Sequence, residues 1–254
     1  MRGWRIGRVA GIDVEINYSW LFILVMLVMG FGVEFAQRVP EAPGWQAQLA
    51  GLLAALLFFG CLLAHELAHS LAARAYGIGV ARITLFLFGG VAQTRREAPS
   101  ALAEMVIAGV GPVASLVLGG LLYALGLGAN ALGLNPLIGA AAMRLGLING
   151  LLAVFNLLPA FPLDGGRILR AALWEWWGDL LRSTRAATML GKLGGGLLTV
   201  ARDGAQGAKL TGGEKEGAGR GDFHGGRLAC CLPDALKVIR QGMTKLHAEI
   251  SRSV

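Results

Sequence analysis

The sequence predicts an all-α polytopic membrane protein with at least four transmembrane helices and a short strand or hairpin element near a cluster of polar residues. Composition is the first observation behind this prediction. Of the 254 residues 55% are hydrophobic and only 15% are charged, whereas an ordinary soluble domain carries about a quarter charged residues. The second observation is segment length, because a spanning helix needs about 20 mostly apolar residues. Spans are predicted at residues 16–35, 47–75, 102–125 and 136–158.

Short strands are predicted beside these spans. Residues 5–16 partly alternate and carry β-branched side chains, which predicts a strand leading into the first span. Residues 81–94 (ARITLFLFGGVAQT) carry strand-forming residues on both sides of Gly89 and Gly90. This pattern predicts a hairpin or a re-entrant strand rather than another helix.

Basic residues predict the orientation of the spans. Arginines precede the first span and follow the second and fourth, whereas the segment between the first two spans is net acidic. This alternation obeys the positive-inside rule, so we expect a multi-pass protein of the cell (inner) membrane with a cytoplasmic N-terminus. The net charge of +7 is explained by this topology. The lipid bilayer is therefore the expected partner, and nucleic acid is not.

Three polar side chains interrupt the second span in the segment HELAH (residues 65–69). His65 and His69 share one face of a helix, about 6 Å apart along its axis. That spacing lets two imidazoles bind one tetrahedral zinc ion, with Glu66 beside the metal as a base for water. Ionisable groups inside hydrocarbon are costly and functional by default. The alternative is a helix end whose polar groups simply reach the interface.

A catalytic zinc ion needs a third protein ligand, and Asp164 is the best candidate. Pro159 and Pro162 cannot continue a helix, so the fourth span is expected to break there. Such irregular backbone is tolerated in a membrane only against protein or a water-filled cavity. Gly165 and Gly166 allow close backbone approach. Because the second and fourth spans run in the same direction, Asp164 is expected at the depth of the histidines. The alternative is an ordinary turn residue beside two glycines.

Several motifs together resemble the site-2 protease family of intramembrane zinc metalloproteases, in its prokaryotic type without CBS domains. The resemblance covers residues 1 to about 190 and rests on HELAH, FGG, AGVGP and NLLPAFPLDGG. It implies that one Zn²⁺ is bound by His65, His69 and Asp164. Because these residues fall toward the cytoplasmic ends of the predicted spans, the active site is expected to open toward the cytoplasm. It also implies that Glu66 is the general base.

The same resemblance assigns roles in substrate handling. Asn156 matches the Asn of the family motif, and its amide is expected near the metal, where it can steady substrate or the oxyanion. The strand around Gly89 and Gly90 is expected to pair with the unwound substrate. The predicted function is hydrolysis of peptide bonds within or near transmembrane segments of membrane proteins. Glu66 takes a proton from water and passes it to the leaving amine.

Two other functions stay open. Some metal transporters also place His and Glu on a membrane helix, but they usually offer further ligands on neighbouring spans. Here the other two histidines, His224 and His247, lie in the tail. The second alternative is a catalytically silent binder of membrane proteins, if the C-terminal region prevents folding of the active site.

The domain organisation divides at about residue 190. Residues 1–190 are expected to form the intramembrane metalloprotease domain. Residues 191–231 are Gly-rich, weakly hydrophobic and then polar, which is typical of a degenerate fifth span followed by a linker. Residues 232–254 form a tail compatible with one short helix. Members of the family commonly have more helices after the Asp motif, so we expect this region to be divergent, truncated or frameshifted.

Overall fold

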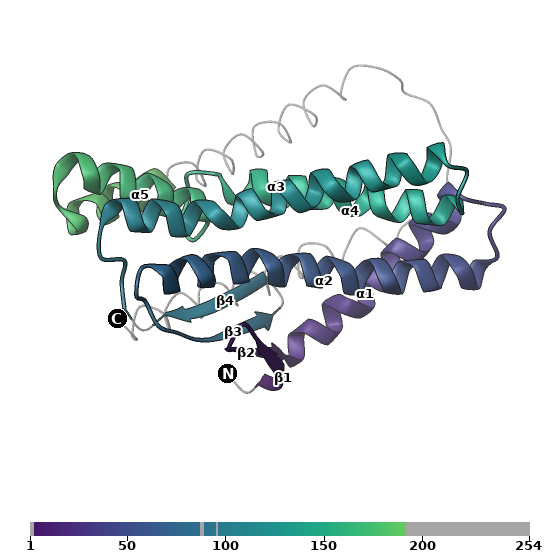
Figure 1. Cartoon of the computed structure of the whole chain (residues 1–254), viewed down its shortest axis with the longest axis horizontal. Coiled ribbons are helices and arrows are strands. Elements are labelled where there is room, and N and C mark those ends of the chain that lie inside the picture. Colours follow the sequence, from purple (N-terminus) through teal and green to yellow (C-terminus); the bar gives the residue numbers. More distant parts are fainter. Residues whose placement is uncertain (1–2, 87–88, 95, 192–254) are drawn as a thin grey trace, which may run out of the picture. The chain divides into compact units, whose positions relative to one another are not determined.

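The computed structural model describes residues 3–86, 89–94 and 96–191 (Figure 1). Its elements in chain order are β1 (Gly3–Val9), β2 (Ile12–Asn17), α1 (Tyr18–Arg38), α2 (Gly44–Ala75), β3 (Val80–Phe86), β4 (Gly89–Thr94), α3 (Ala101–Ala131), α4 (Pro136–Asn156) and α5 (Asp164–Trp177). Residues 180–191 are also helical. The elements predicted beyond residue 191 lie outside the described residues.

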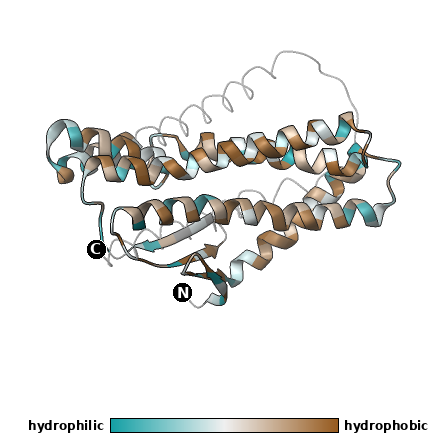
Figure 2. Ribbon diagram, viewed as in Figure 1, coloured by the Kyte–Doolittle hydropathy of each residue, from teal (hydrophilic) through white to brown (hydrophobic). Residues whose placement is uncertain are grey.

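The helices α1 to α4 are long and apolar enough to cross a membrane, which confirms the four predicted spans. Figure 2 shows hydrophobic residues along the lengths of these helices. Many of their large apolar side chains are exposed, among them Phe22, Leu53 and Leu121. A surface of this kind suits hydrocarbon rather than water, because lipid tails are as apolar as leucine.

Glycines let α3 and α4 pack backbone to backbone. A Cβ atom at Gly119 would lie 2.9 Å from the carbonyl oxygen of Gly146, and one at Gly146 would lie 2.7 Å from the carbonyl oxygen of Gly119. A Cβ atom at Gly126 would lie 2.8 Å from the backbone nitrogen of Met143. Small residues serve this purpose in membrane bundles. They also explain why α3 continues to Ala131 and not only to residue 125, since Gly126 is a packing residue rather than a helix breaker.

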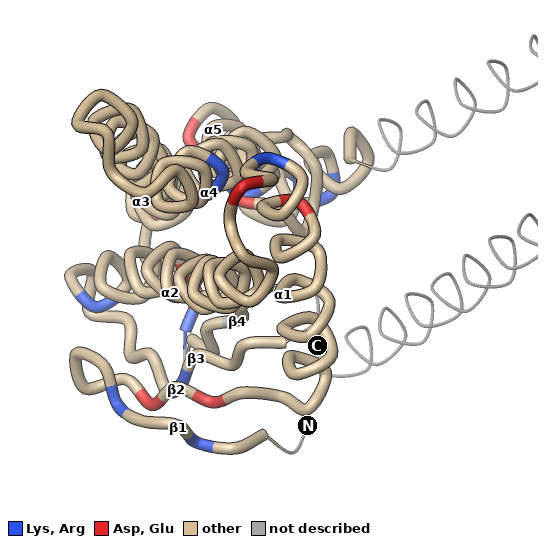
Figure 3. Tube along the Cα trace, turned by 90° about the vertical axis from the view of Figure 1, so that its right-hand side faces the viewer, with Lys and Arg blue, Asp and Glu red and all other residues tan. Residues whose placement is uncertain are grey.

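The N-terminal segment forms a hairpin, where the sequence predicted one strand. Ala10 (φ 48°) and Gly11 (φ 74°) make the tight turn between β1 and β2, and positive φ at both central positions is typical of such turns. Arg8 pairs with Asp13 across the hairpin at 2.8 Å, and charged residues lie on both strands (Figure 3). The hydrogen bond from Arg8 lowers the pKa of Asp13 below its usual value.

The four strands form one sheet in the order β1-β2-β3-β4. Strands β2 and β3 are parallel, and the other two pairs are antiparallel. The predicted hairpin over residues 81–94 is therefore confirmed as β3 and β4. Gly89 and Gly90 are not its turn but the first two residues of β4. Strand β4 is an edge of the sheet and lies beside α2 (Figure 1).

The fourth span breaks as predicted. Helix α4 ends at Asn156, and α5 begins at Asp164 after a seven-residue irregular segment. The close approach expected at the glycines is present. A Cβ atom at Gly166 would lie 2.7 Å from the carbonyl carbon of Ala160, and one at Gly165 would clash with the Leu157 carbonyl. The start of α5 therefore packs directly against the irregular segment, which fixes the direction of Asp164.

Candidate metal centre

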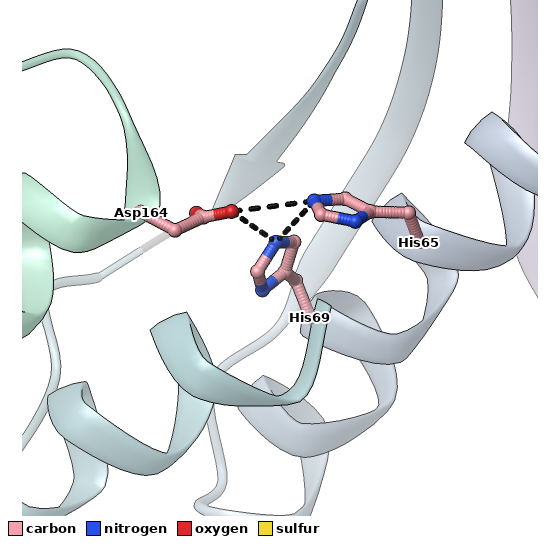
Figure 4. Close-up of side chains that lie close together, drawn as sticks. All are labelled: His65, His69 and Asp164. Atoms are coloured by element: carbon pink, nitrogen blue, oxygen red, sulfur yellow. Dashed lines mark hydrogen bonds and ion pairs between the residues drawn. The ribbon is translucent and has the colours of Figure 1, made fainter. Parts of the chain in front are cut away.

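Three side chains predicted as ligands converge on one point (Figure 4). The Nε2 atom of His65 lies 3.2 Å from the Nε2 atom of His69. The Oδ2 atom of Asp164 lies 3.2 Å from each of these nitrogens. The histidines are one turn apart on α2, and the aspartate is the first residue of α5. Both histidines are almost fully buried, with exposures of 2% for His65 and 7% for His69.

Hydrogen bonds on the far side of each imidazole fix its orientation. The Nδ1 atom of His69 donates to the carbonyl oxygen of Ile107 at 2.6 Å. A carbonyl can only accept, so the proton of a neutral His69 sits on Nδ1 and the Nε2 lone pair faces Asp164. The Nδ1 atom of His65 lies 2.9 Å from Ser115 Oγ, which can accept in the same way. Histidines that bind metals are commonly held by such partners.

The geometry of the three atoms fits a zinc ion. Tetrahedral zinc with bonds of about 2.0–2.1 Å places its ligand atoms about 3.3 Å apart, close to the 3.2 Å observed for all three pairs. Two imidazole lone pairs and a carboxylate oxygen repel one another at this distance unless a cation lies between them. Two His and one carboxylate are also a common ligand set of catalytic zinc sites, which keep a fourth position open.

Gly111 on α3 leaves the space that an ion requires. A Cβ atom at this position would lie 2.9 Å from His65 Nε2 and would clash with His69 Nε2. Pro112 follows it inside the helix. Because proline lacks an N–H, it leaves the carbonyl of Ala108 without its helical donor, one residue after the Ile107 carbonyl that accepts from His69. The AGVGP segment therefore provides room for the ion, and Ile107, the residue just before it, provides an acceptor for one ligand.

The charge state of Asp164 suits a metal ligand. Burial raises the pKa of Asp164, but when the imidazoles of His65 and His69 are protonated, in the absence of a metal, they donate to its carboxylate, which outweighs burial and brings the pKa to about 2. The carboxylate is therefore ionised at neutral pH, which is the form that binds metals.

Glu66 lies against the first residues of β4. A Cβ atom at Gly90 would lie 3.0 Å from Glu66 Cδ and 3.3 Å from Glu66 Oε1. The absence of a side chain at Gly90 therefore lets the strand backbone approach the carboxylate. The predicted base and the predicted substrate-pairing strand are neighbours in the fold.

Asn156 is the last residue of α4, and its side chain bonds locally. Its Nδ2 atom donates to the carbonyl oxygen of Leu152 at 3.0 Å. Within the described part of the chain no hydrogen bond joins Asn156 to the three converging side chains. Its role beside the metal stays a prediction.

Sequence reasoning missed several residues around this centre. Ser115 is an isolated polar residue in the apolar middle of α3. Its position inside a predicted span could have marked it in the sequence as a candidate functional residue. Glu104 is 1% exposed, and its carboxylate pairs with Arg170 of α5 and lies 3.8 Å from Arg167 Nε. The guanidinium of Arg170 also lies over the ring of Phe161 in the irregular segment. These contacts hold the start of α5 against α3.

Comparison with known proteins identifies the family of this chain. The model of peptidase family M50 matches residues 53–142 and 130–200. A Synechocystis protein assigned as a zinc metalloprotease is 39% identical over 201 residues, covering 78% of this chain and 51% of the relative. A Mycobacterium tuberculosis protein with the same assignment is 37% identical over 188 residues, covering 74% of this chain and 48% of the relative. The chain thus spans about half the length of these relatives.

A solved structure shares the fold. The site-2 protease from Methanocaldococcus jannaschii superposes with a TM-score of 0.54 at 26% sequence identity, covering 88% of this chain and 100% of that one. The M50 matches together extend over more than half of the sequence. The chain therefore belongs to peptidase family M50, the site-2 protease family.

Proposed function

We propose that this chain is an intramembrane zinc metalloprotease that hydrolyses peptide bonds within or near transmembrane segments of membrane proteins. One observation carries the proposal: three ligand atoms lie 3.2 Å apart in the interior of a predicted membrane bundle. Family membership and the zinc metalloprotease assignments of the relatives support it. Nothing in the described part of the chain favours a metal transporter or a silent binder.

In this proposal His65 Nε2, His69 Nε2 and Asp164 Oδ2 hold the metal, and Glu66 is the general base. The zinc ion, when bound, supplies a Lewis acid that acidifies water and polarises a peptide carbonyl. The Glu66 carboxylate accepts a proton from the attacking water. It then delivers that proton to the nitrogen of the leaving amine. Ser115 and Ile107 keep both imidazoles in the tautomer that presents Nε2.

Strand β4 is the proposed docking edge for the substrate. A peptide bond inside a helix is sterically hidden, so the substrate must be extended before water can attack it. An edge strand offers unpaired backbone donors and acceptors to such a segment. Because Gly90 borders Glu66, a segment added to β4 passes the base. Asn156 is proposed to steady the oxyanion, which requires its amide to leave the Leu152 carbonyl.

The proposed location is the cell membrane, with the site opening toward the cytoplasm. His65 lies ten residues before Ala75, the last residue of α2, or about 15 Å from that end of the helix. Basic residues gather on the same side, with Arg74 in the last turn of α2 and Arg82 on β3. This placement supports a cytoplasmic end that water can reach.

Cleavage by the purified full chain tests the proposal. Wild type and Glu66→Gln are incubated with a panel of single-span membrane substrates, with and without a zinc chelator. Wild type is expected to cleave at least one substrate and to stop when zinc is removed. Glu66→Gln is expected to retain zinc and to lose cleavage. Equal cleavage by both proteins would contradict the assigned base, and chelator-resistant cleavage would contradict a zinc mechanism.

A further inference from the structure

A cavity of about 340 Å³ lies where α2 ends and α3 begins, beside α5. Its volume is at the lower end of the range for small-molecule sites. The lining combines apolar and charged side chains, among them Ala73, Ile78, Arg96, Glu104, Arg167 and Arg170. None of these side chains belongs to the proposed metal ligands or the base.

The lining includes buried polar atoms that lack partners. Glu104 gives one carboxylate oxygen to Arg170, but its Oε2 atom is buried and has no hydrogen-bond partner among the described residues. The Nε atom of Arg170 is also buried and has no hydrogen-bond partner among the described residues. An unpaired buried polar group costs about 1–3 kcal/mol. The charged and polar side chains that line the cavity suit polar contents better than an apolar side chain.

The available charge in the cavity is positive. Three arginines line it against two glutamates, and Glu104, the buried glutamate, is already paired with Arg170. Arg96 is exposed and has no ion pair among the described residues. A guanidinium of this kind binds a carboxylate through two parallel hydrogen bonds.

Strand β4 connects the proposed catalytic centre to this cavity. Gly90 borders Glu66 at one end of the strand, and Thr94 at the other end lines the cavity. The separation of four residue steps between these positions corresponds to about 13 Å of strand. Figure 1 shows β4 pointing toward the end of the bundle where α5 lies. A substrate strand paired with β4 would therefore run from the base to the cavity.

We propose that this cavity is a specificity pocket that binds an acidic side chain of the substrate about four residues from the scissile peptide bond. The inference rests on the proposed function and adds a substrate class to it. Arg96 and Arg167 are the groups that receive the carboxylate, and the apolar side chains of Ala73 and Ile78 form the wall. The preferred substrates are membrane proteins with an Asp or Glu about four residues from the cleavage site. In the bound substrate this residue lies toward the C-terminal end of α2.

A position scan tests the pocket in the purified full chain, in zwitterionic detergent without anionic lipid. Asp, Asn or Lys is placed singly at each position two to six residues on either side of the cleavage site of one substrate. We expect Asp to raise kcat/KM about 3- to 10-fold over Asn at one position about four residues away. Arg96→Glu should abolish that preference or transfer it to Lys. Arg185→Glu, an exposed charge reversal outside the cavity, should preserve it.

The outcomes separate this inference from the proposed function. Cleavage with no charge preference at any position overturns the pocket and leaves the protease in place. Equal effects of Arg96→Glu and Arg185→Glu overturn it as well, since they indicate diffuse electrostatics. Failure of wild type to cleave any substrate counts against the protease. In that case, the pocket is tested by peptide binding to Glu66→Gln, measured by fluorescence anisotropy. Equal affinity for Asp and Asn peptides would overturn the pocket.

Discussion

The Nε2 atom of His69 lies 3.2 Å from the Oδ2 atom of Asp164, across 95 residues of sequence. His69 is in the long helix α2, whereas Asp164 begins α5 after the break that ends the fourth span. Two structural features meet at this contact. The i, i+4 spacing of the histidines supplies two ligands from a regular helix, and the irregular segment turns the chain so that α5 presents the third.

Replacement of Asp164 by asparagine should empty the metal site. The amide keeps the shape but removes the negative charge that binds the cation. Zinc content of the purified variant, measured by atomic emission, should fall from about one per chain to background. Asp179→Asn is the matched control, because Asp179 is a helix-capping carboxylate outside the centre and asparagine also caps helices. Equal zinc content in wild type and Asp164→Asn would remove Asp164 from the ligand set.

Ser115 should contribute to metal affinity without touching the metal. Ser115→Ala removes the oxygen beside His65 Nδ1, which leaves that ring free to rotate or change tautomer. Loss of such a partner typically weakens metal binding about 10- to 100-fold. Competition with a chelator measures the zinc dissociation constant, and Ser115→Thr should restore most of the affinity because it retains the hydroxyl. An unchanged dissociation constant for Ser115→Ala would contradict this role.

Sequence patterns predicted the features that depend on residues close together in the chain. They missed the contacts between residues of different helices. The spacing of His65 and His69 is local, and so is the break at Pro159 and Pro162. The hydrogen bond from His69 to Ile107 joins residues 38 apart. No periodicity encodes that distance, because it depends on how α2 and α3 pack.

The fold shows the same division. The four spans follow directly from hydropathy, and the β3–β4 hairpin follows from its strand-forming residues. The β1–β2 turn was missed because Ala10 adopts a positive φ, which is uncommon for alanine and cannot be predicted from the residue type. The third span is predicted to end at residue 125, too early, because a single sequence does not show that Gly126 packs against Met143.

A methyl group at Gly111 should exclude the metal. The new Cβ atom of Gly111→Ala would lie against both Nε2 atoms of the proposed ligands, inside the space that the ion needs. Zinc binding should be lost while the helix content, measured by circular dichroism, stays that of wild type. Gly109→Ala is the matched control, because a Cβ atom there meets nothing within 4 Å. Full zinc occupancy of Gly111→Ala would show that the ion lies elsewhere.

Substitution of Gly90 should impair catalysis and spare the metal. Alanine at this position would press on the Glu66 side chain and displace either the base or β4. Displacement of about 1 Å can lower the catalytic rate about 100-fold, so kcat should fall by that order with zinc content unchanged. Gly7→Ala, a strand glycine in open space on β1, should behave as wild type. Loss of zinc from Gly90→Ala would instead indicate that β4 supports the metal ligands.

The buried pair of Glu104 and Arg170 should control the position of Asp164. Glu104→Ala leaves Arg170 and Arg167 without their buried counter-charge, and removal of one partner of a buried pair costs about 3–5 kcal/mol. The melting temperature in detergent should fall, and zinc affinity should fall with it, because α5 carries Asp164 at its first turn. Glu175→Ala, which removes an exposed carboxylate of the same helix, should change neither quantity. A lower melting temperature with unchanged zinc affinity would show that the pair stabilises the bundle without positioning the ligand.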